Sequence, residues 1–137
     1  MIGSIDSSVF LARFLGEERS RHAGELMGQC SAAVVSRVAE VEVRRGLSFI
    51  PSSVERALAH VVFEQQWRGL NVMDVDSTVA GLATDIASTT GVKTLDSLHI
   101  ATAVLAEVDV LITFDRRQAQ AAQAYDITVL GVDEDPS

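Results

Sequence analysis

One short segment constrains the fold of this chain more than any other. Val110-Leu111-Ile112-Thr113 is an apolar run without the alternation of polar residues seen in strands that have one solvent-facing side. Such strands lie at the centre of parallel sheets, with helices packed on both faces. We therefore expect a central sheet between two layers of helices.

The rest of the chain alternates short strands with helices. We predict strands at residues 1–5, 32–35, 70–75, 110–113 and 127–130. After a turn at Asp6-Ser7, we predict helices at residues 8–16, 17–28, 36–46, 52–67, 76–89, 95–108 and 116–125. Their N-caps are expected at Ser36, at Ser52 (with Glu55 three residues on, a capping-box pattern) and at Asp76 or Ser77. Leu95, Leu98, Thr102 and Leu105 are expected to form one apolar helix face. The alternation predicts a three-layer α/β/α fold with a mostly parallel central sheet.

Length and composition narrow the possible functions. The 137 residues suit one domain, which we place at 1–132, followed by an acidic end at 133–137 that we expect to be frayed. No apolar run is long enough to cross a membrane, and the N-terminus does not resemble a secretion signal. Together with the single cysteine, Cys30, this predicts a cytoplasmic protein.

The net charge of −8 argues against non-specific electrostatic binding to nucleic acid. Most of the acids are expected on a solvated surface. A few of them could instead converge on a metal ion, which would then supply the positive charge that a phosphate substrate needs.

Three acids fall at element boundaries where ligands commonly bind, and a fourth lies inside a helix. Asp6 ends the first predicted strand and Asp115 follows the strand at 110–114, and ligands of parallel sheets usually bind beyond the carboxyl ends of strands. Asp96 lies in the first turn of a predicted helix, and Glu42 lies inside another, between two valines.

Each acid also has a structural interpretation. Asp6 could form an Asx-turn, and Asp115 could be an N-cap with Gln118 completing a capping box. Asp96 could simply complement the helix dipole. Glu42 could occupy an exposed or partly buried helix position. Taken singly, these acids are more often structural, so the functional interpretation depends on their combination and local sequence.

That combination resembles the four acidic motifs of PIN domains, in particular of the VapC toxin branch. The matching segments follow the family's order through almost the whole chain. They are Ile5-Asp6-Ser7-Ser8, Val41-Glu42-Val43-Arg44-Arg45-Gly46-Leu47, Thr94-Leu95-Asp96-Ser97-Leu98-His99-Ile100-Ala101-Thr102-Ala103 and Ile112-Thr113-Phe114-Asp115-Arg116-Arg117. The third motif, Leu-Asp-x-x-His followed by Ala-Thr-Ala, is the most specific of the four.

The resemblance implies a metal-dependent endoribonuclease of toxin–antitoxin type. Asp6 and Asp96 match the family's principal metal-binding aspartates, and Glu42 and Asp115 match its other two acids. We expect Asp115 to bind the metal directly or through water, and Glu42 to act through water or as a base. Glu40 is the alternative to Glu42. An oxygen-only ligand set suits Mg²⁺, with Mn²⁺ as a substitute.

The remaining expectations concern the surroundings of the acids and the partners. Ser7 and Thr113 stand where a hydroxyl assists the family's site. Arg116 is expected to contact the scissile phosphate, to pair with a site acid, or to be an ordinary charged residue of a first helical turn. His99 is expected to be packed and hydrogen-bonded rather than a ligand, and Trp67 to lie in the core or an interface.

The family also implies an RNA substrate, a cognate VapB-like antitoxin and a homodimer. Two other functions remain open: an RNA-processing or structure-specific nuclease with the same site, and a catalytically inactive interaction module. A response regulator is set aside, because Asp6 lacks an acidic neighbour and Lys93 precedes a helix.

Overall fold

A parallel sheet runs through the middle of the computed structural model, which describes residues 1–132. Its strands, in the order β3-β2-β1-β4-β5, are β3 (Asn71–Met73), β2 (Ala32–Ser36), β1 (Ile2–Ile5), β4 (Val110–Ile112) and β5 (Thr128–Leu130). Each pair of neighbouring strands is parallel. The predicted sheet is therefore confirmed, with β1 at its centre between β2 and β4.

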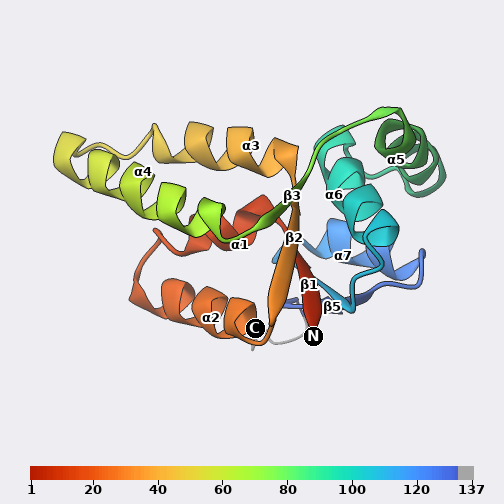
Figure 1. Ribbon diagram of the computed structural model, residues 1–137, viewed down its shortest axis with the longest axis horizontal. Helices are drawn as coiled ribbons and strands as arrows, with labels where there is room; N and C mark the ends of the chain where they lie inside the picture. Colours follow the sequence, from red (N-terminus) through yellow and green to blue (C-terminus); the bar gives the residue numbers. More distant parts are fainter. Residues whose placement is uncertain (133–137) are drawn as a thin grey trace.

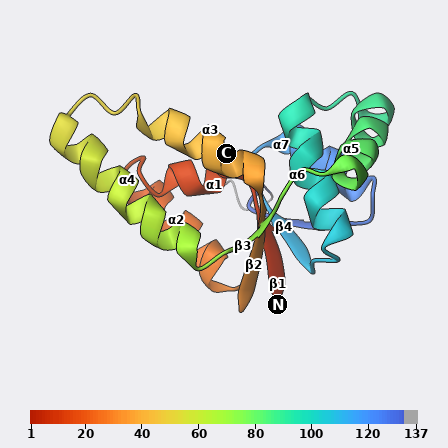
Figure 2. The same ribbon diagram turned by 45° about the horizontal axis from the view of Figure 1, so that its top comes forward.

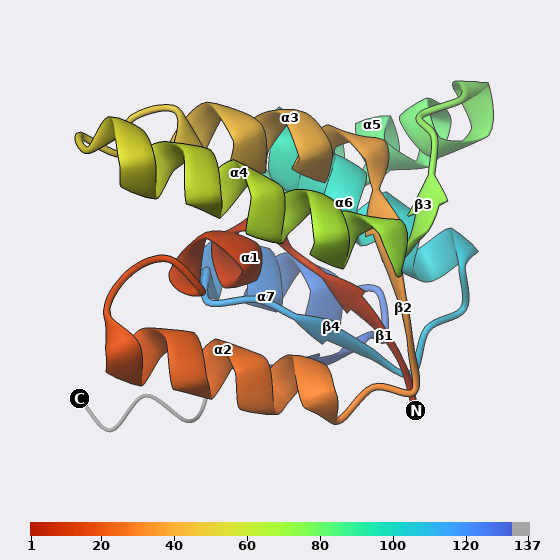
Figure 3. The same cartoon turned by 60° about the vertical axis from the view of Figure 1, so that its left-hand side comes forward.

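Helices cover both faces of the sheet (Figures 1 and 3). One layer holds α1 (Ser7–Ala12), α2 (Glu17–Gly28), α3 (Arg37–Leu47) and α4 (Ser53–Arg68). The other holds α5 (Ser77–Thr90), α6 (Thr94–Leu105) and α7 (Arg116–Gln123). Along β4, Val110 and Ile112 belong to the core beneath the first layer and Leu111 to the core beneath the second. This alternation confirms that the apolar strand is buried on both sides.

Several predicted helix starts are confirmed by side-chain caps. The Ser36 hydroxyl accepts a hydrogen bond from the Val38 amide, and Asp76 accepts one from the Val79 amide. Ser52 accepts one from the amide of Glu55. Each bond satisfies a backbone N–H that the first turn of a helix leaves unpaired.

Three predicted helices extend past the observed ends, α7 by only two residues. α1 ends at Ala12 instead of residue 16, because the amides of residues 13–15 donate to carbonyls three residues back rather than four. Gly16, with a positive φ of 76°, then ends this turn and begins α2 as its N-cap. α6 ends at Leu105 instead of residue 108, and Glu107 just beyond it has a φ of 53°, which no right-handed helix accommodates.

The predicted apolar face of α6 is wrong. Leu95 and Leu105 are exposed, whereas the five residues 99–103 are all buried. α6 packs against the sheet, α3, α5 and α7, so its middle is enclosed on every side and has no single apolar stripe. Leu95 and Leu105 lie near its two ends.

The α3–α4 hairpin extends away from the sheet (Figure 2). At its base Phe63 packs edge-on against Phe10, with ring centroids 5.9 Å apart, and against Trp67 at 5.5 Å. Trp67 is therefore a core residue, one of the two predicted alternatives. No helix within residues 1–132 is both long and apolar enough to span a membrane. The predicted frayed end at 133–137 lies outside the described residues.

Candidate metal centre

The neighbouring strands β1 and β4 bring the first site residues together. Ile5 of β1 pairs with Ile112 of β4, and the Asp6 amide donates to the Ile112 carbonyl at 3.0 Å. The residues that follow the two strands are therefore neighbours at one edge of the sheet. There the Thr113 hydroxyl donates to Asp6 Oδ2 at 3.2 Å.

Asp6 is buried and fixed by several donors. It caps α1, and its Oδ2 atom accepts hydrogen bonds from the Ser8 amide at 3.2 Å and the Ser8 hydroxyl at 2.5 Å. The turn that was one interpretation of Asp6 is therefore present, but it uses only the Oδ2 atom of the carboxylate. The other oxygen, Oδ1, faces Gln118 and His99, at 3.3 and 3.5 Å. Asp6 can therefore act as a helix cap and still contribute an oxygen to a site.

Asp115 is the N-cap of α7, as one interpretation predicted. Its Oδ1 atom accepts from the amides of Arg117 and Gln118, at 2.9 and 3.1 Å. The predicted capping box is nevertheless wrong, because the Asp115 amide donates to the Thr113 hydroxyl at 3.1 Å and the Gln118 side chain extends elsewhere. Thr113 thus contacts both Asp6 and Asp115.

Gln118 is the site residue that sequence reasoning missed. Its side chain is fully buried, and its Nε2 atom lies 3.3 Å from Asp6 Oδ1 and 3.4 Å from Asp96 Oδ1. The amide therefore joins the carboxylates that end β1 and begin α6. The helix holds three glutamines and three alanines, so the only signal in the sequence that singles out Gln118 was its place three residues after Asp115.

Glu42 reaches the same place from α3. Its Oε1 atom lies 2.6 Å from Nε2 of His99, which also lies 3.5 Å from Asp6 Oδ1. His99 is 1% exposed, so it is packed and hydrogen-bonded as expected.

Glu40 points elsewhere, into a network of ion pairs. It lies 3.3 Å from Arg37 and 3.4 Å from Arg44. Arg37 also forms an ion pair with Asp74, and Arg44 forms one with Glu64 of α4. Glu40 is thereby tied to the surface of α3 and α4, while Glu42 shares the surroundings of Asp6 and Asp96.

The crowding of acids has an electrostatic consequence. Burial, together with the negative charges of Asp115, Asp6 and Glu42, raises the pKa of Asp96 from 3.8 to about 6. Burial alone would lower the pKa of His99, but its hydrogen bond with Glu42 and the nearby carboxylates raise it overall. The other three predicted acids therefore act electrostatically on Asp96.

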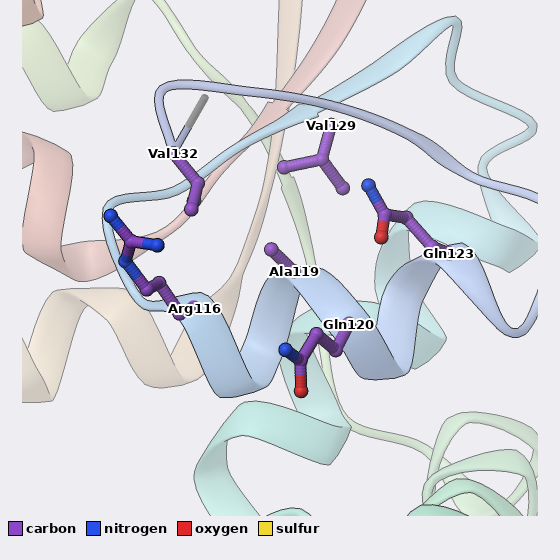
Figure 4. Close-up of a pocket in the computed structure, with 6 residues that line it drawn as sticks. All are labelled: Arg116, Ala119, Gln120, Gln123, Val129 and Val132. Atoms are coloured by element: carbon purple, nitrogen blue, oxygen red, sulfur yellow. The ribbon is translucent and has the colours of Figure 1, made fainter. Parts of the chain in front are cut away.

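The three remaining predicted residues lie around this cluster. Thr113 contacts Asp6 directly. Ser7 is buried in the first turn of α1, and it is the next residue, Ser8, whose hydroxyl bonds to Asp6. Arg116 begins α7 and lines a pocket of about 160 Å³ with Ala119, Gln120, Gln123, Val129 and Val132, where its side chain extends towards Val132 (Figure 4). None of the four acids is among the residues that line this pocket.

The donor set fits a hard divalent cation. Asp6, Asp96 and Asp115 supply carboxylate oxygens, the ligands that Mg²⁺ and Mn²⁺ prefer. A cation would also relieve the repulsion that raises the pKa of Asp96. Within residues 1–132, no three Asp, Glu, His or Cys side chains converge closely enough to enclose a metal by themselves. Any cation held here would keep water ligands or use another protein oxygen.

Comparison with known proteins gives a family and a fold. A family model described as PIN domain matches residues 4–124. Among solved structures, FitAcB from Neisseria gonorrhoeae superposes with a TM-score of 0.76 and 20% identity, over 96% of this chain and 97% of that one.

Two further structures are similar. VapC20 of Mycobacterium tuberculosis, described as a sarcin-ricin-loop-cleaving toxin, has a TM-score of 0.70 and 15% identity, over 87% of this chain and 94% of that one. DNA-bound VapBC of Salmonella typhimurium has a TM-score of 0.69 and 18% identity, over 94% of this chain and 96% of that one. The comparison with curated proteins gave no match.

Proposed function

The chain belongs to the PIN-domain family, and on that basis we propose that it is a metal-dependent endoribonuclease acting as the toxin of a VapBC-type toxin–antitoxin pair. The observation that carries the proposal is the meeting of Asp6 and Asp96 at the edge of the sheet, bridged by Gln118. Asp115 and Glu42 lie close enough to change the pKa of Asp96. All four acids of the family motifs are therefore present, and two of them, Asp6 and Asp96, share a hydrogen-bond partner.

Asp6 and Asp96 would hold the cation directly, and Asp115 directly or through water. A bound Mg²⁺ or Mn²⁺ ion lowers the pKa of its water and neutralises charge on the phosphoryl oxygens. In a chain with a net charge of −8, this positive charge is what lets an RNA backbone approach the acids.

The protein's own groups orient the reaction. Hydrogen bonds from Ser8 and Thr113 fix one oxygen of Asp6 and leave the other facing the site. Glu42, held by His99 on one side and about a quarter exposed, is placed to accept a proton from an attacking water. Ser7 and Arg116 are proposed to contact the substrate at the margin of the site.

The toxin role and the partners are proposed from the similar structures. One of these is described as a toxin–antitoxin complex from Klebsiella pneumoniae, and another as VapBC-1 from nontypeable Haemophilus influenzae. At 17% identity, each of these establishes the fold alone. By analogy we propose a VapB-like antitoxin and a homodimer for this chain.

Expression in a bacterial host tests the toxin role. Induction of the wild-type chain should arrest growth, and Asp96→Asn should not. Co-expression of an antitoxin encoded beside the gene should restore growth. Arrest by the Asp96→Asn variant to the same extent would contradict a nuclease toxin, whereas RNA cleavage in vitro without growth arrest would favour an RNA-processing nuclease.

A further inference from the structure

The amide of Gln118 is buried beside two aspartates, and within residues 1–132 only one of its two ends has hydrogen-bond partners. It is 0% exposed, and its Nε2 atom contacts one carboxylate oxygen each of Asp6 and Asp96. Its Oε1 atom, by contrast, is buried without a hydrogen-bond partner among the described residues. A buried carbonyl without a partner costs free energy, because it has lost its hydrogen bonds with water. A leucine would fill a similar volume without that cost.

The orientation of this amide depends on what lies between the two aspartates. With Nε2 turned towards them, the amide offers N–H donors to two negatively charged oxygens. Turned by 180° about its last torsion, which is broad and roughly two-fold, the same amide would present Oε1 instead. That orientation is repulsive beside two bare carboxylates. It becomes favourable beside a divalent cation, which accepts amide carbonyl oxygens as ligands.

We propose that Gln118 is part of the cation site, a positioning residue that acts in both orientations. Without a cation, its NH₂ group holds Asp6 and Asp96 together. With a cation bound, its amide turns and presents Oε1 to the ion or to one of its waters, so that the buried oxygen gains a partner. Gln118 thereby supplies the further protein oxygen that the Asp, Glu, His and Cys side chains of residues 1–132 do not provide. The inference rests on the proposed metal-dependent function.

Binding of Mn²⁺ alone to the full-length chain tests this role. After removal of metal with EDTA and dialysis, free Mn²⁺ is followed during a titration by its electron paramagnetic resonance signal. Gln118→Leu removes both ends of the amide, whereas Gln118→Glu keeps an oxygen and adds charge. Gln120→Leu is the matched control, because Gln120 is an exposed glutamine of the same helix.

We expect Gln118→Leu to bind Mn²⁺ about tenfold more weakly than the wild type. Gln118→Glu should bind at least as tightly as the wild type, and Gln120→Leu should match it. Without metal, Gln118→Glu should melt at a lower temperature, because a carboxylate replaces the NH₂ donor between two acids. Mn²⁺ should then raise its melting temperature more than that of the wild type.

Three results would overturn the inference. Gln118→Leu could bind Mn²⁺ as tightly as the wild type or more tightly, which would mean that the amide only fills space or competes with the ion. Should Gln118→Leu not fold, weaker Mn²⁺ binding by Gln118→Glu than by the wild type would have the same meaning. If the wild type itself binds no Mn²⁺, the proposed metal-dependent function fails as well, so the two failures can be told apart.

Discussion

The imidazole of His99 and the carboxylate of Glu42 form a short contact, 2.6 Å between Nε2 and Oε1, that ties α6 to α3. His99 is almost fully buried, whereas the Glu42 side chain is about a quarter exposed. A buried histidine therefore fixes the Glu42 carboxylate, while part of the Glu42 side chain stays exposed to solvent. A proposed proton acceptor needs this arrangement, because its position must be fixed while water can still reach it.

Replacing His99 should therefore impair cleavage through Glu42. We expect His99→Leu to cleave RNA about 10–100-fold more slowly than the wild type, as is typical for residues that orient a site carboxylate. A circular dichroism spectrum like that of the wild type would exclude gross unfolding. Unchanged cleavage would mean that His99 serves packing alone.

Glu42 and Glu40 offer a matched pair on one helix. A helix turns by about 100° per residue, so the two side chains lie about 200° apart. Glu42→Gln should reduce cleavage by orders of magnitude. Glu40→Gln should leave it near the wild-type rate, because it loses only partly exposed ion pairs with Arg37 and Arg44. Rate measurements on both variants decide the register of the second motif, and the reverse outcome would shift that motif by two residues.

The pKa of Asp96 makes a prediction about stability without metal. Because its folded-state pKa is raised from 3.8 to about 6, the folded protein binds this proton more tightly than the unfolded chain does. The free energy of unfolding that this group contributes is therefore present at low pH and is lost as the pH rises from 3.8 to about 6.

Asp96→Asn should accordingly melt at a higher temperature than the wild type at about pH 7.5, both free of metal, and the difference should shrink at about pH 5. The variant should also lose RNA cleavage. Differential scanning calorimetry at both pH values checks the first statement. A variant that melts several degrees below the wild type at the higher pH would show that the Asp96 carboxylate is structural.

Much of the fold follows from local sequence patterns, whereas part of the site does not. The buried strand at 110–112 and the caps at Ser36, Ser52 and Asp76 are set by neighbouring residues, so the sequence could predict them. The roles of Gln118 and Ser8 depend on contacts between distant elements. Gln118 lies 112 residues from Asp6, and its spacing from Asp115 suggested a capping box instead. The enclosure of α6 by neighbours on all sides likewise leaves no periodic pattern to detect.

RNA cleavage by the purified chain, with and without a divalent cation, tests the proposed function most directly. We predict cleavage of single-stranded RNA in Mg²⁺ or Mn²⁺, its complete loss in EDTA, and its return when excess cation is added. The Asp6→Asn variant should be inactive under all of these conditions, which excludes a contaminating ribonuclease. Cleavage that continues undiminished in EDTA, or that Asp6→Asn retains, would contradict a carboxylate-held metal as the catalyst.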